Sequence, residues 1–185
     1  MVTASHPQLA PGNHRAFMEY AVEQARLSPP GPDKFCVGAV LADGDTGEIL
    51  STGYSIELPG YMEGDSGSTH AEQCCFIKIA LQHGLPAVRA EEHIRDFLPA
   101  NTVLYTTMEP CNARLSENRT CCDRIVSLKC KIQTVYVGIR EPNTFIVGND
   151  GKKRLEAEGF KFEMVDGTQD LCYEVAMNGH VKHSE

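Results

Sequence analysis

The chain has 185 residues, of which 42% are hydrophobic and 23% are charged, so it can bury the core of one soluble globular domain. It contains no apolar run that could span a bilayer, so we expect a protein that does not bind membranes. Residues 1–12 lack the basic start and the apolar segment of a signal peptide, so we expect a cytoplasmic or nuclear location. The formal net charge of -8 argues against nucleic acid as a partner, because a polyphosphate requires a basic face, and favours a small-molecule substrate.

Hydrophobic spacing in the first half of the chain predicts two helices around a β-hairpin. Apolar residues recur at helical spacing over residues 14–27 and again over residues 70–83. Between them, short extended patterns at residues 37–42 and 48–54 are separated by the turn sequence DGDTG, which is typical of a hairpin.

The second half of the chain predicts alternating strands and helices. The expected strands are residues 102–107, 134–139 and 161–165, and the expected helices are residues 121–128, 151–158 and 168–177. This order predicts a three-layer α-β-α sandwich with a central mixed sheet of about five strands. We expect a single domain over residues 1–185, in which residues 1–12 and 178–185 are flexible or lid-forming tails.

Eight cysteines are present, and a chain without a secretion signal is expected to keep them reduced. They are therefore predicted to be core residues, metal ligands or catalytic groups rather than disulfide partners. Cys74 and Cys75, for example, lie within the apolar pattern of residues 70–83 and are expected to pack as small buried hydrophobic side chains.

The segment Thr69-His70-Ala71-Glu72, at the start of the second helical pattern, has two interpretations. Thr69 could cap the helix with Glu72 reaching back as its capping-box partner, and His70 would then have no special role. Alternatively, His70 offers a ring nitrogen to a metal, and Glu72 lies within reach of a metal-bound water as a general acid and base. The zinc-deaminase signature is His-x-Glu followed by Pro-Cys and a later Cys, so the presence of its second half decides between them.

The second half is present as Met108-Glu109-Pro110-Cys111, then nine residues, then Cys121-Cys122. A Pro-Cys step that directly follows a strand leaves the next amides free to face an anion, which favours a thiolate at Cys111. Cys121 and Cys122 compete for the third ligand position, because adjacent cysteines cannot both readily coordinate one ion. The spacing alone leaves this choice open.

These residues predict a catalytic rather than a structural zinc site. His70, Cys111 and one of the adjacent cysteines give three protein ligands, which leaves a fourth position open for water, whose pKa zinc lowers to roughly 7. Glu72 could then carry a proton from that water to a departing amine. The alternatives are buried thiols or a closed structural site, whose fourth ligand could come from Cys122, His180 or His183.

With these motifs in place, the chain resembles the riboflavin-biosynthesis deaminases over roughly residues 37–165. Those enzymes have a Thr-Leu-Glu-Pro-Cys strand end, a long gap to the next ligand, and a later Asp-Pro-Asn segment before a glycine-rich helix start. The matching segments here are Thr107-Met108-Glu109-Pro110-Cys111, the gap that ends at Cys121-Cys122-Asp123, and Arg140-Glu141-Pro142-Asn143 through Val147-Gly148. The wide gap disfavours nucleoside, cytosine and transfer-RNA deaminases, which usually have only two residues between the cysteines.

The resemblance implies a cytidine-deaminase-like fold, a Zn²⁺ ion held by His70, Cys111 and Cys121, and Glu72 as the catalytic acid and base. The nine-residue gap and the segment 111–116 look like the fungal branch, which implies hydrolytic deamination of a diamino-ribitylamino-pyrimidinone 5'-phosphate to the amino-ribitylamino-uracil phosphate. We expect a homodimer, as is common in the superfamily, that has neither the reductase nor the pseudouridine-synthase domain of some relatives.

A phosphate on the substrate requires local cations in an acidic protein, and Arg114 and Arg119 both lie between two expected ligands. The other candidate substrate-binding residues are Asn112, Glu141, Asn143 and His180. The charged members of this set could equally be solvated surface residues, and the C-terminal segment 178–185 could fray or could cover the pocket. The chain departs from the family pattern at residues 32–35 and 57–69, so no substrate contacts carry over there.

Two other functions fit the same signature. The chain could be a zinc deaminase that acts on a nucleoside, cytosine or a guanine-like base, or a non-catalytic zinc-binding scaffold. Glu72 argues against the scaffold, because a structural metal site does not need that carboxylate.

Overall fold

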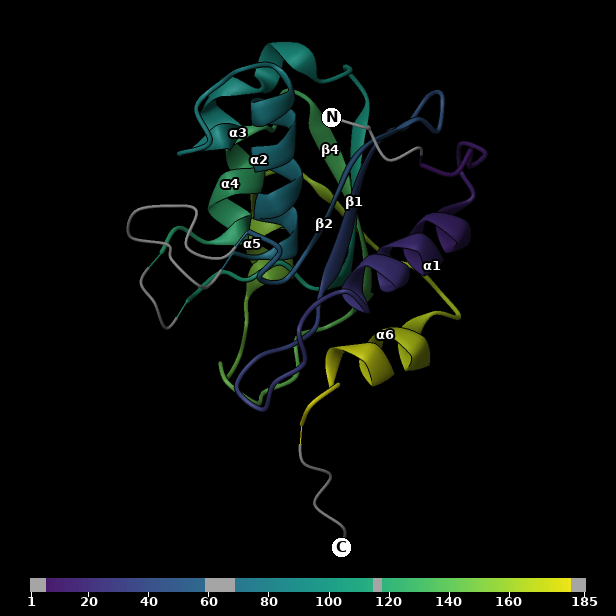
Figure 1. Cartoon of the computed structure of the whole chain (residues 1–185), viewed down its shortest axis with the longest axis vertical. Coiled ribbons are helices and arrows are strands. Elements are labelled where there is room, and N and C mark those ends of the chain that lie inside the picture. Colours follow the sequence, from purple (N-terminus) through teal and green to yellow (C-terminus); the bar gives the residue numbers. More distant parts are fainter. Residues whose placement is uncertain (1–5, 59–68, 115–117, 181–185) are drawn as a thin grey trace, which may run out of the picture.

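The computed structural model describes residues 6–58, 69–114 and 118–180, and its centre is a five-stranded mixed sheet (Figure 1). The strands are β1 (Gly38–Asp43), β2 (Ile49–Tyr54), β3 (Thr102–Met108), β4 (Ile132–Ile139) and β5 (Lys161–Met164), in the spatial order β2-β1-β3-β4-β5. β1 pairs antiparallel with β2 and β3, whereas β3, β4 and β5 run parallel. The predicted mixed sheet is confirmed.

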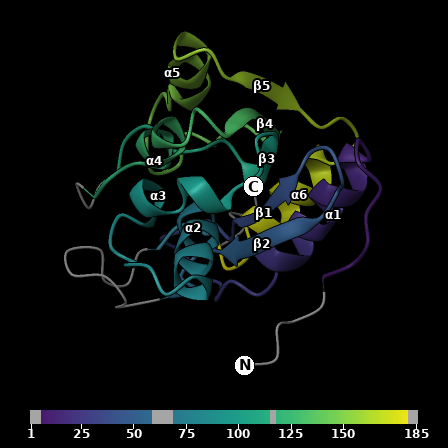
Figure 2. The ribbon, with the colours of Figure 1, turned by 90° about the horizontal axis from the view of Figure 1, so that it is seen from above.

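Helices cover both faces of the sheet (Figure 2). One face carries α1 (His14–Ala25) and α6 (Gln169–Ala176), and the other carries α2 (Ala71–Gln82), α3 (Ala90–His93), α4 (Cys121–Ser127) and α5 (Gly151–Ala157). Side chains along a strand alternate between its faces. Leu41 of β1 therefore joins the core beneath α2, while its neighbour Val40 joins the core beneath α1. The three-layer sandwich is confirmed.

The expected elements agree with the observed ones to within two residues at each end. Two short elements were not expected, namely α3 and the 3₁₀ helix η1 (Arg95–Phe97), because neither is long enough to show helical spacing. Ala90 and Ile94 anchor this segment in the core next to α2. Cys74 and Cys75 are fully buried, as predicted.

Some of the expected features fall outside the described residues. These are the start of the N-terminal tail, most of the loop at residues 57–69, part of the segment 111–116, and His183 with the rest of residues 181–185. Within the described part of the chain, no helix combines the length and the apolar character needed to cross a membrane.

Candidate active site

His70 is the N-cap residue of α2, at the point where the chain leaves the loop after β2. Its backbone N–H donates to Gln73 Oε1 at 3.4 Å. A Cβ at Gly53 of β2 would lie 2.0 Å from the Ala71 carbonyl oxygen, so glycine at this position lets the start of α2 pack closely on the sheet. The interpretation in which Thr69 caps the helix with Glu72 is therefore wrong, because the cap lies one residue later and Gln73 is its partner.

Cys111 follows β3 and is held by a side chain that the sequence analysis did not identify. Asn149 Oδ1 accepts from the Asn112 and Gly151 N–H groups at 3.0 and 3.2 Å, and Asn149 Nδ2 donates to the Pro110 carbonyl at 3.2 Å. These bonds fix the backbone on both sides of Cys111. A Cβ at Gly151 would lie 2.1 Å from the Pro110 carbonyl oxygen, so glycine also permits α5 to begin against this turn.

Cys121 is the first residue of α4, and the cap of that helix fixes its position. Thr120 Oγ1 accepts from the Asp123 N–H at 3.1 Å and donates to Asp123 Oδ2 at 2.8 Å. A threonine N-cap of this kind satisfies an amide that the first turn leaves unpaired. The cap therefore orients the turn that carries the Cys121 side chain.

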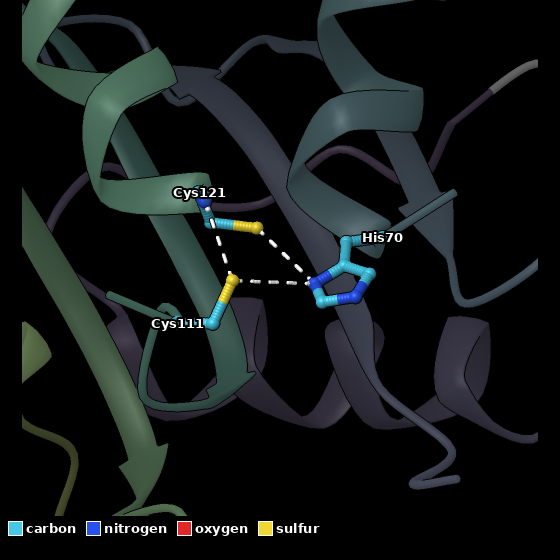
Figure 3. Close-up of side chains that lie close together, drawn as sticks. All are labelled: His70, Cys111 and Cys121. Atoms are coloured by element: carbon cyan, nitrogen blue, oxygen red, sulfur yellow. Dashed lines mark hydrogen bonds between the residues drawn. The ribbon is translucent and has the colours of Figure 1, made fainter. Parts of the chain in front are cut away.

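The side chains of His70, Cys111 and Cys121 meet from three different parts of the chain (Figure 3). His70 Nδ1 lies 3.5 Å from Cys111 Sγ and 3.4 Å from Cys121 Sγ, and the three ligand atoms all lie within 4.8 Å of one another. Ligand atoms in a tetrahedral zinc site, with bonds of 2.0–2.3 Å, are separated by roughly 3.5 Å. One imidazole nitrogen and two sulfurs at this spacing fit a zinc ion.

Cys122 and His180, the other candidates for a metal ligand within the described residues, point elsewhere. Cys122 Sγ donates to the Pro110 carbonyl at 3.5 Å, and burial raises the pKa of this thiol far above its usual range. His180 Nε2 hydrogen-bonds the Lys34 carbonyl oxygen at 2.8 Å. Among the described residues, His70, Cys111 and Cys121 form the one group of three potential ligands that gathers at a single point.

The pKa values of the two thiols at the site shift in opposite directions. Hydrogen bonds from Cys121 and His70 hold the pKa of the Cys111 thiol well below its usual range. The neighbouring Cys111 sulfur, together with burial, raises the pKa of the Cys121 thiol. A bound cation stabilises thiolates, so a metal at this point would favour loss of the second proton as well.

Glu72 lies beside the three ligand atoms and is almost completely buried, with 3% of its surface exposed. Its Oε1 accepts from Thr106 Oγ1 at 3.4 Å, and its Oε2 accepts from Cys121 Sγ at 3.4 Å. Burial raises the pKa of this carboxyl, because the charged form loses its hydration. A carboxyl with a raised pKa next to a metal position is suited to act as a general acid and base.

A cavity of about 320 Å³ opens beside this group, and His70, Cys111 and Glu72 border it. Of the six candidate substrate-binding residues, Arg114 and Glu141 also border it. Glu141 Oε2 is shielded from solvent and has no hydrogen-bond partner among the described residues, and burial raises the pKa of this carboxyl to about 7. Phe35 and Phe145 form an apolar part of the cavity wall, and neither residue was among the predicted substrate-binding residues.

The other four candidates stabilise the surroundings of the cavity and do not border it. Arg119 forms ion pairs with Glu91 at 3.0 Å and Glu92 at 2.6 Å, which tie the segment before Cys121 to α3. Asn143 Oδ1 accepts from the Gly148 N–H at 3.0 Å. The Asn112 N–H is bound by Asn149, and His180 is bound to Lys34, as described above.

Comparison with known proteins agrees with this geometry. The family model for the cytidine and deoxycytidylate deaminase zinc-binding region matches residues 11–139. The diaminohydroxyphosphoribosylamino-pyrimidine deaminase of Schizosaccharomyces pombe is 36% identical over 172 residues, which cover 93% of this chain and 37% of that protein. The chain thus spans a little over one third of the length of this curated relative.

Two solved structures of Aspergillus oryzae Rib2 deaminase, both C-terminal deletion mutants, have the same fold. The structure at pH 4.6 is 36% identical, with a TM-score of 0.77 over 91% of this chain and 93% of that one. The structure in complex with DARIPP at pH 6.5 is 37% identical, with a TM-score of 0.75 over 90% of this chain and 91% of that one. The chain therefore belongs to the cytidine and deoxycytidylate deaminase family and, within it, to the riboflavin-biosynthesis deaminases of the fungal type.

Proposed function

We propose that this protein is a zinc-dependent hydrolase that deaminates a diamino-ribitylamino-pyrimidinone 5'-phosphate in riboflavin biosynthesis. Its products would be ammonia and the amino-ribitylamino-uracil phosphate. The observation that carries the proposal is the meeting of the ligand set His70, Cys111 and Cys121 with the buried Glu72 carboxyl beside one cavity. The Aspergillus oryzae complex with DARIPP and the name of the Schizosaccharomyces pombe relative support a diaminopyrimidine substrate, although that name gives a phosphoribosylamino rather than a ribitylamino group.

His70, Cys111 and Cys121 are proposed to hold the metal. Their donor set of one nitrogen and two sulfurs is one that zinc accepts, and three protein ligands suit a catalytic site with an open position. When bound there, zinc would supply Lewis-acid activation of water at neutral pH. Asn149 and the Thr120 cap would keep the two cysteines in place for it.

Glu72 is proposed to carry the protons. It would take one proton from water as a carbon–oxygen bond forms at the ring carbon that bears the amine, and it would pass that proton to the adjacent ring nitrogen. The proton remaining on the new hydroxyl would then pass through Glu72 to the amine as the carbon–nitrogen bond breaks. One water is consumed, ammonia leaves and a carbonyl remains, so the atoms balance.

The substrate contacts are proposed from the cavity wall. Arg114 and Glu141 border the cavity, and Glu141 Oε2 can accept a hydrogen bond from an amino group of the pyrimidine because it has no partner among the described residues. Arg119, Asn143 and His180 are proposed to act through the neighbouring segments that their side chains hold in place. Asn112 is proposed to act through its backbone N–H, which Asn149 holds.

The proposal is tested by incubating the zinc-loaded protein with the diamino-ribitylamino-pyrimidinone 5'-phosphate and with its ribosylamino counterpart. Ammonia release from the ribityl compound supports the proposed function, and preference for the ribosyl compound would contradict assignment to the fungal type. Turnover of a nucleoside, cytosine or guanine instead would identify the alternative zinc deaminase. Zinc binding without turnover of any of these compounds would identify the non-catalytic scaffold.

The assembly and location of the protein are also proposals. We infer a homodimer because proteins of this superfamily commonly assemble, and light scattering on the purified protein measures its mass in solution. We also infer a cytoplasmic location, which imaging of a tagged chain tests.

A further inference from the structure

The charges around the cavity are unfavourable for a phosphorylated substrate. The acidic side chains that border it are Asp33, Glu72, Glu109 and Glu141, and the lysine and arginine side chains are Lys34 and Arg114. Glu109 is partly compensated, because its Oε2 accepts from Arg140 Nε at 2.5 Å and its Oε1 accepts from the Lys152 N–H at 2.7 Å. A phosphate in this cavity therefore needs a cation that protein groups have not already engaged.

Protein groups already engage Arg114 and Arg119, the two arginines between Cys111 and Cys121 in the sequence. Arg114 Nη1 donates to the Arg119 carbonyl at 3.2 Å. Arg119 itself pairs with Glu91 and Glu92, and its Nη2 donates to Ser127 Oγ at 2.7 Å. Both guanidinium groups thus bind other protein groups, which leaves less of their hydrogen-bonding capacity for a ligand.

Lys34 is different. It borders the cavity, and its ammonium nitrogen Nζ is shielded from solvent without a hydrogen-bond partner in residues 6–58, 69–114 and 118–180. A shielded ammonium without an acceptor is unfavourable, because it has lost hydration and gained nothing in return. The flexible four-carbon stem of lysine allows the ammonium to move toward an anion that enters the cavity.

The backbone of Lys34 is fixed by the C-terminal end of the described chain. His180 Nε2 bonds the Lys34 carbonyl oxygen at 2.8 Å, and the His180 ring stacks on Phe35 with 5.4 Å between centroids and 8° between planes. The Cys36 N–H donates to the Ala176 carbonyl at 3.0 Å. The lysine side chain therefore starts from a fixed point in the cavity wall.

We propose that Lys34 binds the phosphate of the substrate and so selects phosphorylated over unphosphorylated pyrimidines. This inference rests on the proposed function, which requires a phosphorylated substrate but does not say which residue binds it. Lys34 lies in the segment 32–35 that departs from the family pattern, so the residue is a property of this chain rather than of the motif.

The test compares Lys34→Gln with the control Lys153→Gln, which removes an exposed lysine of α5. Each variant, with its zinc content measured, is assayed on the diamino-ribitylamino-pyrimidinone 5'-phosphate and on its dephosphorylated form. Lys34→Gln should lower kcat/KM about tenfold to a hundredfold for the phosphorylated compound, as loss of a charge-assisted hydrogen bond implies, and less than about twofold for the dephosphorylated one. Lys34→Arg should restore most of the loss, and Lys153→Gln should match the unmodified protein.

Equal losses on both compounds, or no loss on either, would overturn the proposal. A protein that releases ammonia from neither compound would instead refute the proposed function. The role of Lys34 is then decided by calorimetric titration of the zinc-loaded protein with inorganic phosphate. Weaker binding to Lys34→Gln than to the unmodified protein supports the proposal, whereas equal binding, or no binding to either protein, overturns it.

Discussion

Replacing Cys121 with alanine is expected to remove zinc, whereas the same replacement at Cys122 is not. The two residues are neighbours in α4, and both are fully buried. Cys121 Sγ lies 3.4 Å from His70 Nδ1, while Cys122 Sγ lies 3.5 Å from the Pro110 carbonyl oxygen. The pair therefore compares two equally buried thiols that differ in the direction of the sulfur.

The expected magnitude follows from the number of ligands. Zinc binding to a four-ligand protein site is worth about 10–16 kcal/mol, so one ligand contributes roughly 3–4 kcal/mol, or two to three orders of magnitude in Kd. Cys122→Ala removes a buried sulfur and its weak hydrogen bonds, which should lower the free energy of unfolding by about 1 kcal/mol. Its zinc Kd should stay within about threefold of the unmodified value.

The assay is competition for zinc with a chromophoric chelator, combined with metal analysis after dialysis and with thermal melts of the zinc-free variants. The melts show whether each chain folds, so loss of metal is not mistaken for loss of structure. If Cys122→Ala lost zinc and Cys121→Ala kept it, the assignment of the third ligand would be refuted.

Three further predictions concern the surroundings of the site. Thr120→Ala removes the cap of α4 and should lower the free energy of unfolding by about 1 kcal/mol in denaturant titrations, and an unchanged midpoint would contradict the role of the cap. Because burial raises the pKa of Glu141 from 4.5 to about 7, the folded zinc-free protein keeps a proton that the unfolded chain releases between these values. Its stability should therefore fall as pH rises through that window, by roughly 1–2 kcal/mol after allowance for partial exposure. Glu141→Gln should reduce this slope and leave the part that the raised pKa of Glu72 contributes. His180→Ala removes the bond to the Lys34 carbonyl and should raise KM several-fold with little change in kcat. Truncation after Met177 should also raise KM. Unchanged kinetics in both variants would exclude a role of the chain after Met177 in substrate binding.

The sequence predicted the fold well because most helices and strands are long enough to show the spacing of hydrophobic residues that is typical of each. Ten helices and strands follow hydrophobic spacing, and the alternation of Val40 and Leu41 between the two cores is the physical origin of that pattern. Segment α3 was missed because four residues cannot show helical spacing, and its position depends on the burial of Ala90 and Ile94.

The gathering of His70, Cys111 and one of the two adjacent cysteines was predictable because the order of these residues matches a motif, and the family resemblance selected Cys121. The substrate-binding side chains were not predictable in this way. Arg119 was expected near the substrate because it lies between two expected ligands in the sequence, but it pairs with Glu91 and Glu92. Chain proximity limits how far a residue can lie from the metal and says nothing about the direction of its side chain. Lys34 and Asn149 carry no local signal, because tertiary contacts far along the chain bring them to the site.

The most direct test of the central claim is the zinc content of Glu72→Gln and its ammonia release from the diamino-ribitylamino-pyrimidinone 5'-phosphate, measured beside the unmodified protein. Glutamine keeps the size of the side chain and removes its ability to exchange protons. The proposed mechanism predicts that zinc is retained while ammonia release falls by about 100-fold or more, as loss of a general acid and base implies. Loss of the metal, or release of ammonia at an undiminished rate, would contradict the role assigned to Glu72.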